Sequence, residues 1–480
     1  MPGKSDNLLV GLSIGTTKIT MIVAERDRRY PDSVHVIGFG KAPSRGISKG
    51  IIVSLQDARQ SVQRAFADAQ SMTGISPGRL RNVIVAFNGM DIKNESTHGM
   101  VTLGGRESKS VEESDLNRVI ERAMANSVLA TASRNSMYSL HMIPTNYELD
   151  GRPINEPLNM NGNQLDIWIQ TVAVPMTYAQ DVVNCVQSAG LEVKGLLLKP
   201  IASALGAAYD DEMRAGCISV CIGGGTTGIV LFRNGRAFRV MSIPIGGDHI
   251  RSDLASVLHI SLSEAERLKQ RIFIDSEEDL RRNGIDIDLA YQAIFARLEE
   301  LFNDQIRRAL AECTPQHFPS GIILSGGVSD TPGIEMMLEN ILQIPVRKVY
   351  EPVYTFPQPL ANAAYVSSAG ILKYYVTVER DPYVFMDSGQ ELPGLHYKPD
   401  PKSKDDNKGK KHIPSKKEKV EDDYPDEGGY DEEPEGYDGY DEGESDDVNE
   451  EPDPYGEGRT KRENFTEIAR TIAEKIKRLF

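Results

Sequence analysis

The sequence has few cysteines, one tryptophan and no long apolar run. Its cysteines, Cys185, Cys217, Cys221 and Cys313, show neither C-x-x-C nor metal-ligand spacing. This pattern excludes a disulfide framework or a zinc site of the usual spacing, and we expect buried thiols in a reducing compartment. No apolar run approaches about 18 residues and no apolar leader is present, so we expect a cytoplasmic chain without a membrane-spanning helix or secretory signal.

The negative charge of the chain is concentrated in one segment that has no lysine or arginine. The formal net charge is −16, but residues 421–457 alone hold 19 acidic side chains and no lysine or arginine. Residues 1–380 carry a net charge of about −3. The body of the protein therefore has no basic footprint, and we expect no nucleic-acid partner.

Glycine and threonine gather in two segments, 9–20 and 218–230, which we interpret as strand, tight turn and strand. The amides of such a turn can form an anion-binding nest, and threonine hydroxyls are hydrogen-bond donors. A glycine hairpin without a ligand would look similar. Two such hairpins in one chain nevertheless indicate a duplicated domain that holds one phosphate chain from both sides. The hairpins are not a P-loop, since no Gly-Lys-Ser/Thr opens a helix. Gly223, Gly225 and Gly228 have the spacing of G-x-G-x-x-G, but an expected strand and not a helix follows them.

The two hairpins resemble the phosphate-1 and phosphate-2 motifs of the actin/Hsp70/sugar-kinase superfamily. Residues 324–328 (Leu-Ser-Gly-Gly-Val) resemble its adenosine motif, and the small-residue segments 199–204 and 363–370 resemble its two connecting helices. Within the superfamily, residues 43–50 and 243–247 are similar to the FtsA family of bacterial division proteins. The resemblance covers about residues 7–376.

This resemblance implies an α/β fold with two actin-like lobes, each a β-β-β-α-β-α domain. The first lobe would comprise 1–89, 165–214 and 360–380, and the second lobe 215–359. The residues themselves support the first half of this order. Three strands are expected in 8–53, then a helix capped by Ser54 and closed near Gly74, then a strand over 82–87.

Residues 90–164 interrupt that order, and we interpret them as an inserted α/β subdomain of the 1C type that FtsA-like proteins carry. A loop region is the alternative. Within the insertion, a helix is expected to begin at the capping box Ser110-x-x-Glu113, and a strand to follow at 138–147. Trp168 is expected in the core, on a strand that returns to the main sheet.

The resemblance further implies that ATP lies between the lobes. The residues it implies at the nucleotide are Gly15, Thr16, Thr17, Lys18, Gly223, Gly224, Gly225, Thr226, Thr227, Gly246, Gly247, Glu266, Lys269, Gly326, Gly327 and Val328. Glu266 and Lys269 have the spacing for ribose and adenine contacts on one helical face, although a solvated ion pair would have the same spacing.

Three positions depart from the superfamily pattern. Ser13, Cys221 and Gly228 stand where carboxylates normally hold the water shell of Mg²⁺. A neutral glycine–threonine cradle can still bind phosphate, whereas turnover depends on metal clamping of charge in the transition state. We therefore predict a protein that binds ATP, with or without Mg²⁺, and hydrolyses it very slowly or not at all. No catalytic residue and no metal ligand is predicted.

The C-terminal part of the chain has two different patterns. Residues 381–463 are poor in aliphatic side chains, which predicts a disordered acidic spacer, with a partner-binding tail as the alternative. Residues 464–480 predict an amphipathic helix that lies in an anionic membrane surface, and a helix for a partner's groove is the alternative. Its apolar stripe consists of Phe465, Ile468, Ile472, Ile476, Leu479 and Phe480.

Together the resemblance implies an actin-like division protein that polymerises on the cytoplasmic face of the membrane at the septum. There it would tether filaments of FtsZ, the tubulin-like division polymer, by holding the FtsZ C-terminal peptide on the second lobe near Arg297. Other division proteins are candidate partners. An actin-like pilus-assembly scaffold is the alternative on the same fold, although it would not need the basic amphipathic C-terminus. An active actin-fold ATPase or kinase is less favoured, because no carboxylate base lies near the hairpins.

Overall fold

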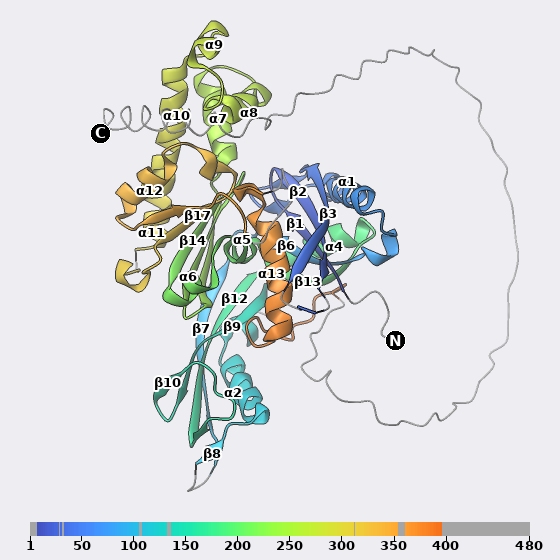
Figure 1. Cartoon of the computed structure of the whole chain (residues 1–480), viewed down its shortest axis with the longest axis vertical. Helices are drawn as coiled ribbons and strands as arrows, with labels where there is room; N and C mark the ends of the chain where they lie inside the picture. Colours follow the sequence, from blue (N-terminus) through green and yellow to red (C-terminus); the bar gives the residue numbers. More distant parts are fainter. Residues whose placement is uncertain are drawn as a thin grey trace, which may run out of the picture. The chain divides into compact units, whose positions relative to one another are not determined.

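The structure is a computed structural model that describes residues 7–27, 29–30, 33–104, 108–131, 136–311, 313–353 and 361–395 (Figure 1). Most of the predicted spacer and the whole predicted amphipathic helix lie outside the described residues. Within the described ranges, no helix combines the length and the apolar character needed to cross a membrane.

Two five-stranded sheets share one topology. The first has the order β13-β6-β1-β2-β3 and is built from β1 (Leu8–Ile14), β2 (Lys18–Arg26), β3 (Val34–Pro43), β6 (Asn82–Phe87) and β13 (Glu192–Leu198). The second has the order β16-β15-β14-β17-β18 and is built from β14 (Cys217–Ile222), β15 (Thr227–Arg233), β16 (Arg236–Ile243), β17 (Ile322–Ser325) and β18 (Val346–Lys348). In each, the first strand pairs antiparallel with the second and parallel with the fourth. The shared order confirms the predicted duplication.

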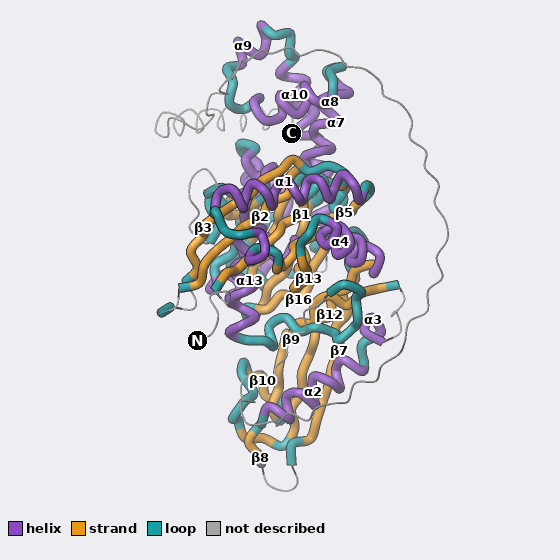
Figure 2. Tube along the Cα trace, turned by 90° about the vertical axis from the view of Figure 1, so that its right-hand side faces the viewer, coloured by secondary structure: helices purple, strands orange, loops and turns teal. Residues whose placement is uncertain are grey.

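Helix α1 (Leu55–Thr73) covers one face of the first sheet (Figure 2). It begins and ends where the sequence predicts. The Ser54 hydroxyl accepts a hydrogen bond from the Asp57 amide, and Gly74 closes the helix with φ 63°. Its buried face consists of Ala58, Ser61, Val62, Ala65 and Ala69. These small side chains let the helix pack directly on β3, where a Cβ on Gly40 would meet the Ala65 carbonyl.

Helices α5 (Lys199–Ala207) and α13 (Val366–Arg380) are the predicted small-residue helices, and they cross backbone to backbone. A Cβ on Gly370 would collide with the Ala202 carbonyl, and a Cβ on Gly206 would collide with the Val366 carbonyl. Helix α13 packs on β1 of the first sheet, while α5 packs on β14 and β15 of the second. The crossing therefore connects the two lobes. Helix α4 (Met176–Ser188) completes the first lobe.

The second lobe carries most of the remaining helices. They are α6 (Asp210–Ala215), α7 (Gly247–Val257), α8 (Leu262–Arg271), α9 (Glu277–Arg282), α10 (Ile287–Glu300), a π-helical turn (Leu301–Ile306), α11 (Arg307–Ala309) and α12 (Ile334–Leu342). Helices α7, α8 and α10 pack on one another, and their buried side chains belong to the same core as those of β14, β15 and β17.

The insertion forms a sheet of its own with the order β10-β9-β12-β7, and α2 (Glu113–Ala125) lies along it (Figure 2). Its strands are β7 (Lys93–Thr102), β9 (Met137–Leu149), β10 (Arg152–Ile154) and β12 (Gln164–Pro175), beside the short ribbon β8 (Lys109–Ser110) with β11 (Asn161–Gly162) and the turn α3 (Val128–Thr131). The predicted capping box is wrong. Ser110 is held in the ribbon, so Glu112 caps the helix and its amide donates to Asp115.

The prediction for Trp168 is also wrong. Strand β12 pairs with β7 as far as Ala173 and with β9 as far as Pro175, so it belongs to the inserted sheet and not to the main sheet. Leu165, Ile167 and Ile169 of β12 enter the core under α2, while Trp168 points to the opposite face because side chains alternate along a strand. There Trp168 is half-buried, and its ring lies against the His98 ring at 4.5 Å between centroids, with the two planes tilted by 35°.

The predicted start of disorder at residue 381 does not hold for residues 381–395, which pack onto the body. Phe385 and Leu392 are buried in the core of the first lobe. Met386 exchanges two backbone hydrogen bonds with Met142 of β9, at 3.0 and 2.9 Å. The side-chain amide of Gln187, on α4, donates to the Gly394 carbonyl at 2.7 Å. The average composition of residues 381–463 is poor in aliphatic side chains, so it did not reveal these few buried residues at the start of the segment.

The helix crossing yields a stability prediction. Replacing Gly370 by alanine should lower the free energy of unfolding by about 1–3 kcal/mol, because the new Cβ has only backbone to displace. Urea denaturation measures the change. Gly78→Ala is the matched control, since a Cβ at Gly78 would meet nothing within 4 Å. Similar stabilities of the two variants would contradict the close crossing.

Candidate functional site

The two glycine hairpins have turns of the same construction. In the first, between β1 and β2, the Gly15 amide donates to the Lys18 carbonyl at 3.1 Å. In the second, between β14 and β15, the Gly223 amide donates to the Thr226 carbonyl at 2.9 Å. The duplication therefore extends from the sheets to the turns that the sequence analysis singled out.

The hairpins face each other and touch. A Cβ on Gly224 would collide with the side chain of Thr17, and one on Gly225 would lie 2.6 Å from the Thr16 hydroxyl. Glycine is thus needed at both positions for close approach. Asn88, which follows β6, joins the two sides by donating from Nδ2 to the Thr226 hydroxyl at 2.7 Å.

A cleft of about 110 Å³ lies between the hairpins. Of the predicted site residues, it is lined by Gly15, Thr16, Thr17, Lys18, Gly223, Gly224, Gly225, Thr226, Gly326 and Gly327. Thr227 does not line the cleft: it is fully buried, and its hydroxyl donates to the Ile245 carbonyl at 2.8 Å. It supports the turn from behind.

The other predicted residues of the second lobe connect to the same hairpin. The amides of Gly247 and Asp248 donate to the carbonyls of Gly223 and Gly224 at 2.9 and 2.7 Å, which holds Gly246 and Gly247 against the turn. Lys269 donates to the Gly247 carbonyl at 3.3 Å and pairs with Glu266 at 2.6 Å. A Cβ on Gly247 would contact Val328 at 3.0 Å. These residues are connected to the second hairpin but do not line the cleft.

Sequence reasoning missed several residues of the cleft wall. Among them are Gly50, Asn88, Lys199, Pro200, Ser203 and Ser367, contributed by turns and by α5 and α13. Asn88 carried the one usable signal, because it directly follows a strand of the sheet that bears the first hairpin. Gly50 lies in a short turn, and the other four depend on how the two helices cross. Ser13 does not line the cleft, and its hydroxyl instead shares a hydrogen bond of 3.0 Å with Ser367.

The ionisable side chains of the cleft wall are basic and not acidic. Among the described residues that line it there is no aspartate or glutamate, and the two ionic side chains are Lys18 and Lys199. Burial lowers the pKa of Lys18 to about 7, helped by Lys199 and Lys41 and opposed by Cys221 and Asp330. Its ammonium lies 4.0 Å from the centroid of the Tyr365 ring. Burial also lowers the pKa of Lys199.

Arg297, predicted at the partner surface, is engaged within the second lobe. Its guanidinium makes two hydrogen bonds to the Asp253 carboxylate, at 2.6 and 2.8 Å, and one to Glu300 at 2.6 Å. The hydrogen bonds to Asp253 raise the pKa of Arg297. Arg297 therefore fastens α10 to α7, and its role at a partner stays a prediction.

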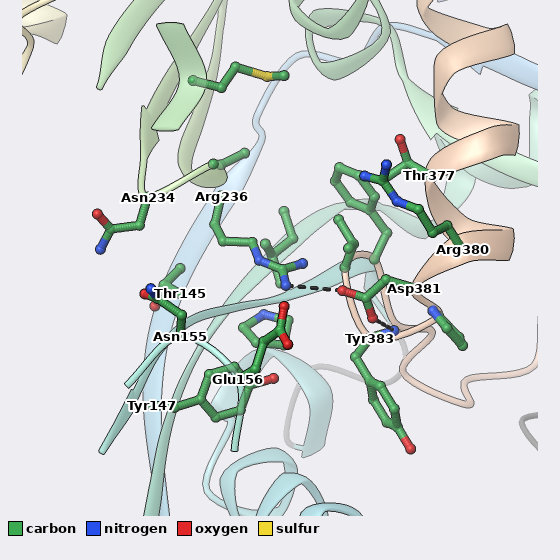
Figure 3. A pocket seen from close by; sticks show the side chains of 18 of the residues that line it. Thr145, Tyr147, Asn155, Glu156, Asn234, Arg236, Thr377, Arg380, Asp381 and Tyr383 are labelled. Carbon is green, nitrogen blue, oxygen red and sulfur yellow. Dashed lines mark hydrogen bonds and ion pairs between the residues drawn. The ribbon is translucent and has the colours of Figure 1, made fainter. Parts of the chain in front are cut away.

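A larger cavity of about 1270 Å³ lies where the insertion, the β15–β16 turn and the end of α13 meet (Figure 3). Arg236 reaches across it to Asp381 at 3.1 Å, and Asp381 also accepts from the Tyr383 amide at 3.0 Å. None of the predicted nucleotide residues lines this cavity. Its size alone does not make it the nucleotide site.

Comparison with known proteins agrees with this geometry. The family model described as "Cell division protein FtsA" matches residues 219–370, and that described as "SHS2 domain inserted in FTSA" matches 89–173, which includes β12 as far as Ala173. The chain is 31% identical to Cell division protein FtsA of Pseudomonas aeruginosa, over 79% of this chain and 91% of that protein. It is 30% identical to the Bacillus subtilis protein of the same name, over 77% and 84% of the two chains.

Among solved structures, the PilM-PilN type IV pilus biogenesis complex is similar, with a TM-score of 0.55 and 17% identity over 77% of this chain and 98% of that one. At this identity the likeness concerns the fold alone. The two equivalent sheets, with glycine hairpins that meet between them, define an actin-like protein. The chain belongs to the FtsA family of cell division proteins.

The lowered pKa of Lys18 predicts how the free energy of unfolding depends on pH. Its pKa is about 7 in the folded protein and about 10.5 when unfolded, so the folded state binds fewer protons between these values. From pH 7 to pH 10, the wild type should therefore gain about 1.4 kcal/mol per pH unit relative to Lys18→Met. Denaturation of both proteins at several pH values measures this. Lys93→Met, at an exposed lysine, should track the wild type, and a pH-independent difference for Lys18→Met would refute the prediction.

Proposed function

We propose that this protein binds ATP between its lobes, assembles on the cytoplasmic face of the membrane at the division site, and tethers FtsZ filaments there. Membership of the FtsA family supports a role in division. The observation that carries the nucleotide part is the meeting of the two hairpins, whose amides and hydroxyls converge on one cleft with basic side chains. A pilus scaffold is disfavoured, because both family models that match are those of FtsA.

The phosphates of ATP would lie between the turns that begin at Gly15 and Gly223. Gly326, Gly327 and Val328 would pack beside the nucleoside, and Glu266 with Lys269 would face its ribose and adenine. A cleft of about 110 Å³ is smaller than the roughly 300–1,000 Å³ usual for such ligands, so nucleotide entry must part the hairpins. Opening would break the contact of Gly224 with Thr17 and the hydrogen bond of Asn88 to Thr226.

Hydrolysis should be very slow, because Ser13, Cys221 and Gly228 supply no carboxylate. Gly228 could not be replaced by aspartate without a shift, since its Cβ would lie 3.0 Å from the side chain of Pro200. Cys221 lines the cleft and Ser13 directly precedes its wall at Ile14, so these are the two positions at which a carboxylate can be introduced.

We predict that the wild type binds ATP in calorimetry while its steady-state phosphate release stays near background. Ser13→Asp/Cys221→Asp should gain Mg²⁺-stimulated turnover, because carboxylates restore a place for the metal; groups that stabilise transition-state charge are worth about 10²–10³-fold each. The neutral pair Ser13→Asn/Cys221→Asn is the matched control and should stay inactive. Robust Mg²⁺-dependent turnover by the wild type would overturn this part of the proposal.

The membrane and FtsZ contacts are assigned to different parts of the chain. Residues 464–480 would insert their apolar stripe into the lipid surface, while their basic side chains meet anionic headgroups. The FtsZ peptide would bind the second lobe on the helical surface around Arg297. Because Arg297 already pairs with Asp253 and Glu300, an acidic peptide would have to compete with those carboxylates.

Flotation of anionic vesicles with the full chain and FtsZ filaments tests both contacts. The wild type should carry FtsZ to the vesicles, and more weakly at high salt. Ile472→Glu should lose the vesicles but still bind FtsZ, because it places a charge on the apolar stripe. Thr471→Glu adds the same charge beside the stripe and should retain more binding.

A chain that ends at residue 395 locates the FtsZ contact. It should lose the vesicles and keep the FtsZ C-terminal peptide. Binding of that peptide by the full chain alone would assign FtsZ to the acidic segment instead, and equal vesicle binding by Ile472→Glu and the wild type would refute the membrane helix.

A further inference from the structure

The nucleotide cleft does not fit a magnesium ion. Mg²⁺ in nucleotide sites is usually held through one or two carboxylates, and the described residues lining this cleft offer hydroxyls, amides and the Cys221 thiol, but no carboxylate. No group of three or more histidine, cysteine, aspartate or glutamate side chains within the described ranges could hold a metal ion. The two ammonium groups already in the wall would also repel a divalent cation.

Lys199 lies against the first phosphate turn. Its Nζ is 2.5 Å from the place where a Cβ on Gly15 would stand, so the absence of a side chain at Gly15 makes room for the ammonium. That ammonium donates to the Ile14 carbonyl at 3.4 Å, which is a long hydrogen bond, and has no carboxylate partner among the described residues. Lys199 begins α5, so the helix crossing sets its position.

Lys18 comes from the other side of the same turn. It makes no direct ion pair in the described part of the chain, although Asp330 lies close enough to act on its pKa. Its ammonium rests on the ring of Tyr365. Two cations held in one buried cleft repel each other and have lost solvation, which is unfavourable unless an anion joins them. Burial lowers the pKa of both lysines in the empty cleft, so a phosphate anion that enters it favours their charged forms again.

We propose that this cleft binds the phosphate chain of a nucleotide without a divalent metal, and that the ammonium groups of Lys199 and Lys18 supply the positive charge in the metal's place. The inference rests on the proposed nucleotide function and concerns the same cleft. Two ammonium groups carry the charge of one Mg²⁺, and the amides of both turns and the hydroxyls of Thr16 and Thr226 are left to orient the phosphate oxygens.

The test measures ATP binding by the full chain in EDTA and in MgCl₂, by calorimetry and by thermal melting. The wild-type affinity in EDTA should lie within about threefold of that in MgCl₂. Lys199→Met should bind at least tenfold more weakly in EDTA, because one charge is lost, whereas Lys199→Arg should retain most of the affinity. Lys93→Met, at an exposed lysine, is the matched control and should match the wild type.

Melting separates a ligand-binding lysine from a structural one. Without ATP, Lys199→Met should melt higher than the wild type, because it removes an unpaired buried charge, yet it should lose the rise in Tm that ATP produces. A structural lysine would instead lower the Tm of the free protein when replaced. Inorganic triphosphate in EDTA distinguishes the sources of the phosphate chain: it should bind, but more weakly than ATP, because the nucleoside contacts are missing.

The outcomes separate this inference from the function it rests on. Wild-type binding that appears in MgCl₂ and vanishes in EDTA would overturn metal-free binding and leave ATP binding intact. Binding in neither condition would overturn both. Equal binding by Lys199→Met and the wild type in EDTA would overturn the role of Lys199. If Lys199→Met does not fold, Lys18→Met in EDTA provides the same comparison.

Discussion

The arrangement of the two lobes depends on one close contact, the crossing of α5 and α13 with no side chain between their backbones at Gly206 and Gly370. Because α13 packs on the first sheet and α5 on the second, the separation of these helices sets how far apart the two glycine hairpins stand. The same helices form part of the cleft wall, since α5 begins at Lys199 and α13 contributes Ser367. The same two helices thus connect the lobes and form part of the binding site.

The neutral residues at the three positions that normally carry carboxylates fit their surroundings. Ser13 shares a hydrogen bond with Ser367, which ties β1 to α13. Gly228 leaves the space that Pro200 occupies at the start of α5. Cys221 faces the cleft, close enough to Lys18 and Lys199 to influence the pKa of both. A carboxylate at any of these positions would change a local contact as well as the charge, so the neutral residues and the two lysines make one consistent site.

Residues 381–395 join the insertion to the first lobe, which the composition of this segment does not reveal. Residues 381–395 leave α13, bridge to Met142 of the inserted sheet and reach α4 of the first lobe through Gln187. The fully buried His141 lies at the same junction, where its ring accepts a hydrogen bond from the Leu198 amide at 3.1 Å and faces Phe385 and Tyr374. Burial lowers the pKa of His141 to about 3, so it stays neutral in the folded protein. The insertion is therefore packed against the first lobe and not merely linked to it.

The sequence by itself determined the duplicated strand–turn–strand units, the helix between Ser54 and Gly74 and the absence of acidic residues from the phosphate motifs, because each is encoded within a few neighbouring residues. Only the tertiary structure decided that β12 with Trp168 joins the inserted sheet, that Thr227 turns away from the cleft and that residues 381–395 are packed. Strand pairing and burial depend on partners far along the chain, which local patterns do not encode. The same holds for Lys199: its charge is visible in the sequence, but its place beside Gly15 follows from the packing of α5 against the sheets.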